Sequence, residues 1–158
     1  MELRVGIGYD AHALEDGVPL VLGGVPFEHT RGLAGHSDGD VIAHALIDAL
    51  LGAANLGDIG SLFPSGDEQY RGASSLDLLW EAYREVRDAG WALVNADCVL
   101  VGEEPRIGEA REEMSERLAG ALGVSKELVA VRATTTDGLG FTGRGDGLAA
   151  HAVALLSR

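Results

Sequence analysis

The chain has 158 residues, of which 46% are hydrophobic and 23% charged, and its formal net charge at pH 7 is −13. This length predicts one domain with its own core, and the excess of acidic groups argues against binding to nucleic acid. One cysteine, Cys98, excludes an intrachain disulfide, and the lack of a leader or of an apolar run near about 18 residues predicts a cytoplasmic protein without membrane contact.

Two short strands bounded by glycine and proline are expected near the start of the chain, at residues 3–8 (LRVGIG) and 19–24 (PLVLGG). From residue 37 the hydrophobic period becomes that of a helix. We predict a helix from about Asp38 to Asn55, with Ser37 as its N-terminal cap. Its apolar face comprises Ile42, Leu46, Ala49, Leu50 and Ala53.

The rest of the chain predicts two more helices and three strands. The helices are expected at 74–90 and at 105–123, where a proline opens the second one. The strands are expected at 91–102, 128–136 and 148–157, although the last apolar run also suits a helix. The inward face of the first of these helices is predicted to hold Leu76, Leu79, Trp80, Tyr83 and Val86.

The order of these elements indicates the fold class. The helices expected at 38–55 and 74–90 follow one another without a strand between them, which argues against a strictly alternating doubly wound sheet. We therefore predict a single α+β domain over residues 1–158, with a mixed sheet packed with helices on one side.

Acidic and histidine side chains form a candidate metal site. Asp10 and His12 are two residues apart in a strand-like segment, so they point to one face. Asp40, His44 and Asp48 are spaced by four and form a polar stripe on the first helix. Asp10, His12 and His44 would supply three zinc ligands with one position open. The alternative is that these are ordinary surface or hydrogen-bonded side chains.

A second polar concentration lies at residues 132–147, RATTTDGLGFTGRGDG. Three threonines offer hydroxyl groups, glycines let backbone amides approach a ligand, and Arg144 adds a charge with bidentate reach. The composition suits a diphosphate, although many glycine-rich segments are plain loops.

Five segments together resemble one known family. They are GYDAHAL (8–14), GHSDGDVIAHALIDALLGAANLGDIGSLFP (35–64), NADCVLV (95–101), the 132–147 segment and AVALL (152–156). These segments resemble the 2-C-methyl-D-erythritol 2,4-cyclodiphosphate synthase family of the non-mevalonate isoprenoid pathway. The resemblance implies an enzyme that cyclises 4-diphosphocytidyl-2-C-methyl-D-erythritol 2-phosphate and releases CMP. It also implies a homotrimer with active sites between subunits and a central cavity that can hold an isoprenoid diphosphate.

The resemblance also implies the metals and their ligands. Asp10, His12 and His44 match the zinc ligands of the family. Asp137 matches the position that contacts magnesium, for which manganese can substitute. Zinc would polarise a phosphoryl oxygen, and magnesium would bridge the diphosphate.

His36 and Thr135 match the catalytic positions, where each would donate a hydrogen bond to phosphoryl oxygens in the transition state. The substrate contacts implied by the resemblance are Ser37, Asp58, Ile59, Gly60, Phe63, Asp67, Gly102, Pro105, Arg106, Ile107, Ala133, Thr134, Phe141 and Arg144.

The sequence departs from the family pattern at several positions. Asp137 and Asp146 stand where glutamate is common, Gly138 where lysine is common, and Ser65 where aspartate is often found. Arg106 replaces a lysine and keeps its charge. These differences affect the expected magnesium geometry and loop contacts, and they leave the zinc ligands unchanged.

Two rival functions stay open at this point. A zinc phosphohydrolase would use the same ligands to hold an attacking water, with Asp40 or Asp48 as a base. A non-catalytic trimeric binding protein would instead hold an isoprenoid diphosphate with Arg144.

Overall fold

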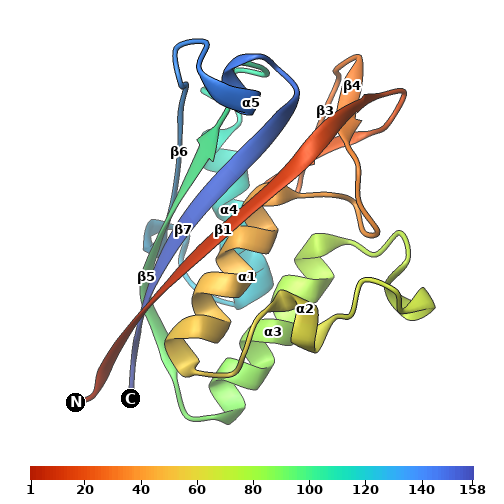
Figure 1. Cartoon of the computed structure of the whole chain (residues 1–158). Helices are drawn as coiled ribbons and strands as arrows, with labels where there is room; N and C mark the ends of the chain where they lie inside the picture. The colour runs from red at the N-terminus through yellow and green to blue at the C-terminus, as the bar shows by residue number, and fades with distance from the viewer.

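A computed structural model of the chain describes residues 1–158. A five-stranded sheet with the order β4-β1-β7-β5-β6 forms one layer (Figure 1). β5 and β6 run parallel, whereas the other neighbours are antiparallel, so the sheet is mixed. A hairpin of two further strands forms a small separate sheet. The strands are β1 (Leu3–Asp16), β2 (Leu20–Leu22), β3 (Val25–Phe27), β4 (Arg31–Leu33), β5 (Ala92–Val101), β6 (Val129–Thr134) and β7 (Gly147–Ser157).

The helices are α1 (Val41–Ala54), α2 (Ile59–Leu62), α3 (Ser75–Asp88), α4 (Arg111–Leu122) and α5 (Gly140–Gly143), with short 3-10 turns η1 (Glu68–Tyr70) and η2 (Lys126–Leu128). α1 packs on β1, β7 and β5, α4 packs on β6, and α3 packs on both helices. The three long helices therefore cover one face of the sheet (Figure 1), which confirms the predicted α+β arrangement. None of the helices has the length and apolar character needed to cross a membrane.

Two glycines of β1 allow α1 to lie directly on the strand. A Cβ added to Gly8 would be 1.8 Å from the carbonyl oxygen of Ala45, and one added to Gly6 would be 2.0 Å from that of Ala49. No side chain larger than hydrogen fits these gaps, because non-bonded carbon and oxygen atoms need about 3 Å or more. This contact places the first turn of α1 beside the second half of β1.

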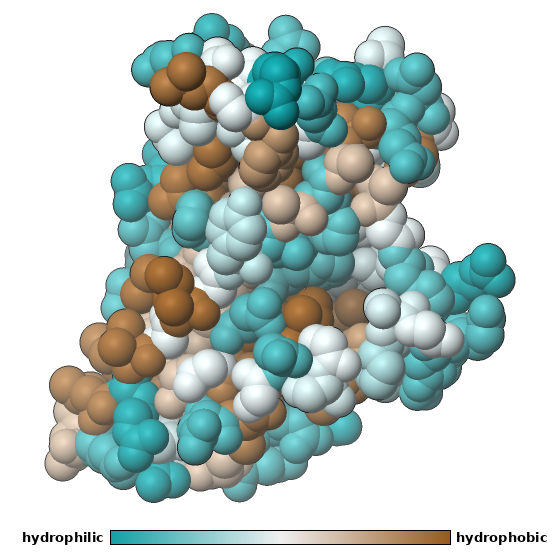
Figure 2. Space-filling model, viewed as in Figure 1, coloured by the Kyte–Doolittle hydropathy of each residue, from teal (hydrophilic) through white to brown (hydrophobic).

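The other face of the sheet is open and partly apolar. Val5 is 69% exposed and Ile7 72%, although both belong to regular strand structure. Tyr9 and Val153 continue the same surface. Figure 2 shows hydrophobic residues gathered at the lower left of the molecule, where the N-terminal half of β1 lies in Figure 1. An apolar surface of this kind on a sheet is typical of an interaction site.

The N-terminal strands differ from the prediction in length. β1 continues past residue 8 to Asp16, because it pairs with β7 as far as Ala13 and with β4 from Leu14 onward. The segment predicted as one strand at 19–24 holds only β2 and the turn after it, and β2 pairs with the following strand β3 in a hairpin. The short elements β4, α2 and α5 were not predicted, since three or four residues carry too little periodicity.

The predicted start of the first helix was wrong by three residues. α1 begins at Val41, and Asp40 rather than Ser37 caps it by accepting a hydrogen bond from the Ala43 N–H. The Asp40 side chain is fully buried and also accepts hydrogen bonds from the backbone N–H groups of Gly23 and Gly24. One carboxylate thus joins the β2–β3 hairpin to the helix.

Three further boundaries or faces need correction. Trp80 is 52% exposed rather than inward, and Leu78 takes the buried position on α3. α4 begins at Arg111 and not at Pro105, because residues 105–110 form a loop and turn. The final apolar run, which also suited a helix, is the strand β7.

We expect Asp40→Asn to lower the free energy of unfolding by about 1–3 kcal/mol. Oδ1 of Asp40 accepts from Gly23 and Ala43 while Oδ2 accepts from Gly24. An amide NH2 in place of either oxygen cannot accept, so at least one buried N–H loses its partner. Urea denaturation would measure the change. Asp88→Asn, at an exposed position, should change the same free energy by less than about 0.5 kcal/mol.

Candidate active site

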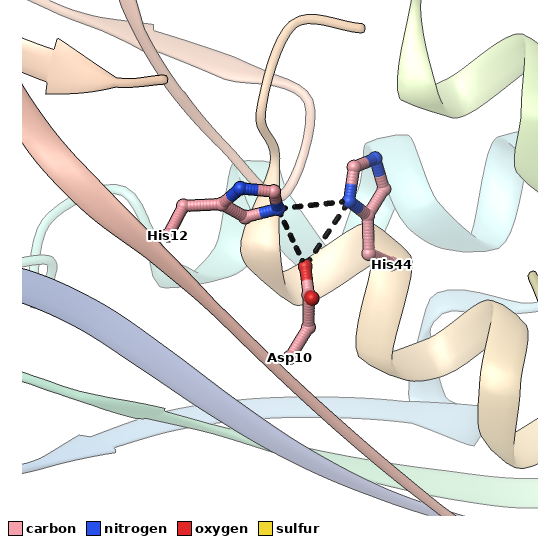
Figure 3. Close-up of side chains that lie close together, drawn as sticks. All are labelled: Asp10, His12 and His44. Carbon is pink, nitrogen blue, oxygen red and sulfur yellow. Dashed lines mark hydrogen bonds and ion pairs between the residues drawn. The ribbon is translucent and has the colours of Figure 1, made fainter. Parts of the chain in front are cut away.

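Asp10, His12 and His44 meet on the helix-covered side of the sheet (Figure 3). Asp10 and His12 lie on the same face of β1, and His44 lies in the first turn of α1. Oδ2 of Asp10 is 2.8 Å from Nε2 of His12 and 3.1 Å from Nδ1 of His44. The two ring nitrogens are 3.3 Å apart. The structure therefore brings together the three side chains that the spacing suggested.

This triad fits a divalent metal ion. Two imidazole nitrogens and one carboxylate oxygen converge within 4.8 Å of one another. Ligand atoms bound to zinc at about 2.0–2.2 Å in a tetrahedron lie about 3.3–3.6 Å apart, which is close to the observed separations. Three protein ligands leave a coordination position for substrate, as catalytic zinc sites require.

The electrostatics of the triad keep its carboxylate ionised. Burial raises the pKa of Asp10, but hydrogen bonds with His12 and His44 outweigh it and lower this pKa to about 2. The hydrogen bond with Asp10 raises the pKa of His12, against the burial that lowers it, and a hydrogen bond with the Ala34 backbone adds to the rise. Asp10 is thus ionised at neutral pH, as a metal ligand must be.

His44 is also held from its other side. Its Nε2 lies 2.8 Å from Oγ of Ser75 and 3.1 Å from Oγ of Ser37. The Ser75 hydroxyl donates in turn to the carboxylate of Asp38. Sequence reasoning missed Ser75 as a partner of His44 and Asp38 as a partner of Ser75, because these pairs are 31 and 37 positions apart in the sequence.

The triad opens into a first cleft of about 200 Å³. Five other predicted site residues line it, namely His36, Ser37, Ile59, Gly60 and Phe63. Nε2 of His36 donates to the carbonyl oxygen of Asp67 at 2.8 Å, which joins the predicted residue Asp67 to this cleft. Asp58 caps the short helix α2 at the cleft's edge. Ser65, which stands where aspartate is often found, also faces the cleft.

A second cleft of about 240 Å³ gathers another group of predicted residues. This group comprises Gly102, Pro105, Arg106, Ile107, Ala133, Thr134 and Thr135. The strand register shows how far apart the two clefts lie. Asp10 of the first cleft pairs with Ala150, Ala150 pairs with Leu100, and Leu100 pairs with Ala133 of the second cleft. Three strand spacings amount to about 14 Å. One chain therefore presents two separate part-sites.

Besides Asp58 and Asp67, three predicted residues lie outside both clefts. Asp137 has a left-handed backbone with φ of 53° and accepts a hydrogen bond of 3.2 Å from the Thr135 hydroxyl. Arg144 pairs with Asp146 at 3.0 Å and lines a third cleft of about 170 Å³. Phe141 is partly exposed on α5.

Asp40 and Asp48, the acids of the predicted helical stripe, accept hydrogen bonds from backbone N–H groups. Asp40 is buried and fully engaged with backbone N–H groups, so it faces no cleft. Oδ1 of Asp48 accepts a 2.7 Å hydrogen bond from the N–H of Ile59 and so fixes the segment that follows Asp58. Burial raises the pKa of Asp48. Neither acid faces the triad's cleft as a hydrolytic base would, so the phosphohydrolase reading loses its candidate bases.

The family assignment follows from the whole chain. The model of the YgbB family matches residues 3–157. The chain belongs to the YgbB family. A YgbB relative named 2-C-methyl-D-erythritol 2,4-cyclodiphosphate synthase, from Moorella thermoacetica, is 58% identical over 154 residues, which cover 98% of this chain and 94% of the relative. The resemblance that the five motifs indicated is thereby confirmed.

Solved structures agree with the YgbB fold described above. A 2C-methyl-D-erythritol-2,4-cyclodiphosphate synthase in its CDP-bound form is 39% identical, with a TM-score of 0.88 over 98% of this chain and 100% of that chain. A bifunctional IspDF of Campylobacter jejuni is 42% identical with a TM-score of 0.94, and the match covers 98% of this chain and 42% of that longer chain.

Proposed function

We propose that this YgbB chain, as a single catalytic domain, converts 4-diphosphocytidyl-2-C-methyl-D-erythritol 2-phosphate into 2-C-methyl-D-erythritol 2,4-cyclodiphosphate and CMP. The observation that carries this proposal is a metal-ligand triad at the base of a cleft, in a chain 58% identical to a synthase of that name. The relative solved with CDP supports a cytidine-linked substrate. The reaction supplies precursors for isoprenoid biosynthesis by the non-mevalonate pathway. The cytoplasmic location stays a prediction.

The triad would hold zinc, and Asp137 would hold magnesium or manganese. When bound, zinc supplies a Lewis acid to a phosphoryl oxygen and magnesium offsets the charge of the diphosphate. Magnesium is commonly held by one or two carboxylates together with substrate phosphates, so the single exposed carboxylate of Asp137 fits that role. Its side chain is one methylene shorter than that of glutamate.

Ring closure needs positioning more than it needs a base. The 2-phosphate attacks the β-phosphorus of the same molecule, so both reacting groups are already tethered and the chain must hold them in line. Asp58, Ile59 and Gly60 would orient the methylerythritol. The second cleft, with Arg106 and Thr134 among its lining residues, would hold the CMP portion that leaves.

His36 and Thr135 would stabilise charge that develops on the phosphoryl oxygens. The Asp67 carbonyl can only accept, so Nε2 of His36 carries a proton. The other ring nitrogen, Nδ1, is left to contact a phosphate. Thr135 donates to Asp137 in the structure, and the same hydroxyl would turn to the substrate.

The two part-sites support a homotrimer whose active sites lie between subunits. The triad of one chain and the second cleft of its neighbour would together bind one substrate. The open apolar face at Val5 and Ile7 offers a surface for that association. Analytical ultracentrifugation should give a mass about three times 16.4 kDa, and a monomer at micromolar concentration would refute the shared site.

We expect Asp137→Ala to weaken the magnesium dependence of turnover far more than zinc retention. Asp137 is not part of the zinc triad, so zinc should stay bound when its carboxylate is removed. The magnesium concentration for half-maximal rate should rise about tenfold or more. Loss of a residue that merely supports a ligand already lowers metal affinity by about 10–100-fold, and loss of the ligand itself should cost at least as much. Magnesium titration and zinc analysis on the same sample would test this. Equal loss of both metals would place the second metal elsewhere.

The third cleft would bind an isoprenoid diphosphate in the centre of the trimer through Arg144. Its guanidinium is exposed and paired with Asp146, and a diphosphate would displace that exposed pair at little cost. Arg144→Ala should weaken binding of an isoprenoid diphosphate, measured by calorimetry, by about tenfold or more. Unchanged binding with an intact trimer would disprove this assignment.

Product analysis tests the main proposal. Zinc-loaded protein is incubated with magnesium and 4-diphosphocytidyl-2-C-methyl-D-erythritol 2-phosphate, and products are identified by mass spectrometry and phosphorus NMR. CMP with a cyclic diphosphate supports the cyclase. Inorganic phosphate or a linear diphosphate would indicate a hydrolase, and unchanged substrate would indicate a binding protein.

A further inference from the structure

His44 has two ring nitrogens, and each faces a different set of groups. Nδ1 faces Asp10 and His12 in the triad. Nε2 faces the hydroxyl of Ser75, which is fully buried at the first residue of α3. Since a neutral imidazole carries one proton, the group that accepts from Nε2 decides which nitrogen is free to bind a metal.

Hydrogen bonding determines the direction of the Ser75 hydroxyl. Asp38 accepts from the backbone N–H of Ser75 at 3.0 Å and from that of Asp40 at 3.1 Å. Its carboxylate oxygen Oδ1 is also in hydrogen-bond contact with Oγ of Ser75. A carboxylate accepts, so the single hydroxyl proton of Ser75 points to Asp38. Ser75 Oγ therefore presents only lone pairs to His44.

The tautomer of His44 follows from that arrangement. Nε2 lies 2.8 Å from an oxygen that can only accept, so Nε2 must carry the proton. Nδ1, which faces Asp10 and His12, is therefore the nitrogen left to bind a metal, once any proton that it shares with Asp10 has been released. The Ser37 hydroxyl, 3.1 Å from Nε2, can accept part of the same hydrogen bond, and it also receives the N–H of Gly39.

We propose that Ser75 and Asp38 are positioning residues that hold His44 as its Nε2–H tautomer and so aim Nδ1 at the metal. This inference rests on the proposed metal site and extends it to residues outside the triad. Supporting partners of this kind typically contribute about 10–100-fold in metal affinity. Ser75 and Asp38 thus act on the metal through His44.

Ser75→Ala is a clean test because it removes the hydroxyl and keeps the backbone N–H that Asp38 accepts from. The matched control is Ser74→Ala, since the neighbouring Ser74 is exposed and makes no side-chain cap hydrogen bond. Zinc affinity is measured with Zn2+ alone in competition with a chelating dye. We expect a loss of about 10–100-fold for Ser75→Ala and less than twofold for Ser74→Ala.

A second measurement reads the tautomer directly. Long-range nitrogen–proton NMR of the His44 ring, recorded on chelator-treated protein, should show Nε2–H in the wild type and a tautomer mixture in Ser75→Ala. In Asp38→Asn the amide can donate to Ser75, whose hydroxyl then turns to Nε2, so the Nδ1–H form should increase. Loss of a merely structural contact would not move these signals.

The outcomes distinguish the metal site from the positioning role of Ser75 and Asp38. If the wild type binds zinc tightly and Ser75→Ala binds it equally well with an unchanged tautomer, the positioning role is wrong and the metal site stands. If the wild type binds no zinc, the metal site itself is wrong, and the positioning role falls with it. Thermal unfolding of each variant shows whether a loss of zinc merely reflects a loss of fold.

Discussion

His44→Ala is expected to reduce bound zinc to well below one ion per chain and to lower turnover by at least about a thousandfold. The side chain supplies one of three converging ligand atoms, and its Nδ1 lies 3.1 Å from Asp10 and 3.3 Å from His12. Two remaining ligands hold zinc poorly, because the ion prefers at least three protein ligands in catalytic sites. Removal of even one transition-state stabilising group costs about 10²–10³ in rate.

The control for this variant is His29→Ala. His29 is half-buried, hydrogen-bonds the backbone of Arg31 and lines none of the clefts described above. Metal content is read by mass spectrometry and turnover by CMP release. His29→Ala should keep its zinc and most of its activity. A His44→Ala protein with full zinc content and normal turnover would refute the assignment of the triad.

Gly8→Ala is expected to lower the free energy of unfolding by about 3 kcal/mol and to weaken zinc binding with it. The new methyl group would lie 1.8 Å from the carbonyl oxygen of Ala45, so α1 must move away from β1. Ala45 follows His44 directly, and the movement therefore separates the ligands on the helix from those on the strand. For a chain of this length the melting temperature should fall by about 6–12 °C.

Gly52→Ala is the matched control because Gly52 lies on the same helix without a close neighbour. A Cβ there would meet nothing nearer than the carbonyl oxygen of Ile7 at 4.0 Å. Replacing a helical glycine by alanine stabilises a helix by about 0.5–1 kcal/mol. We expect Gly52→Ala to melt at or above the wild-type temperature. A Gly8→Ala protein that melts like the wild type and binds zinc equally well would show that the close contact is not essential.

Local patterns in the sequence were sufficient for the long helices and for the ligand types. The apolar residues between Ile42 and Ala53 recur with the period of a helix, although α1 is buried nearly all round and only Asp48 and Gly52 are not buried. Asp10 and His12 share a face for the same local reason, since alternate residues of a strand point together. The five motifs that resemble the YgbB synthases are likewise contiguous segments, and they led to the family without a structure.

The ends of helices and strands could not be predicted from local patterns where they depend on contacts with residues remote in the sequence. β1 continues to Asp16 because β7 and β4 pair with it, and Asp40 caps α1 while it also binds the hairpin at Gly23 and Gly24. Trp80 has the spacing of an inward residue but is 52% exposed, whereas Leu78 and Leu79 beside it are buried in the core that α3 shares with α1 and α4. In each case the deciding atoms lie far away in the sequence.

The sequence by itself indicated the candidate ligands, the helical periods and the family, because each depends on short stretches of neighbouring residues. Only the tertiary structure decided that Asp10 and His12 meet His44, since this requires α1 to lie against the bare backbone at Gly8. It also decided that Ser75 and Asp38 support His44, and that the predicted substrate residues divide between two clefts. These contacts depend on strand register and helix packing, which are set by interactions between segments remote in the chain.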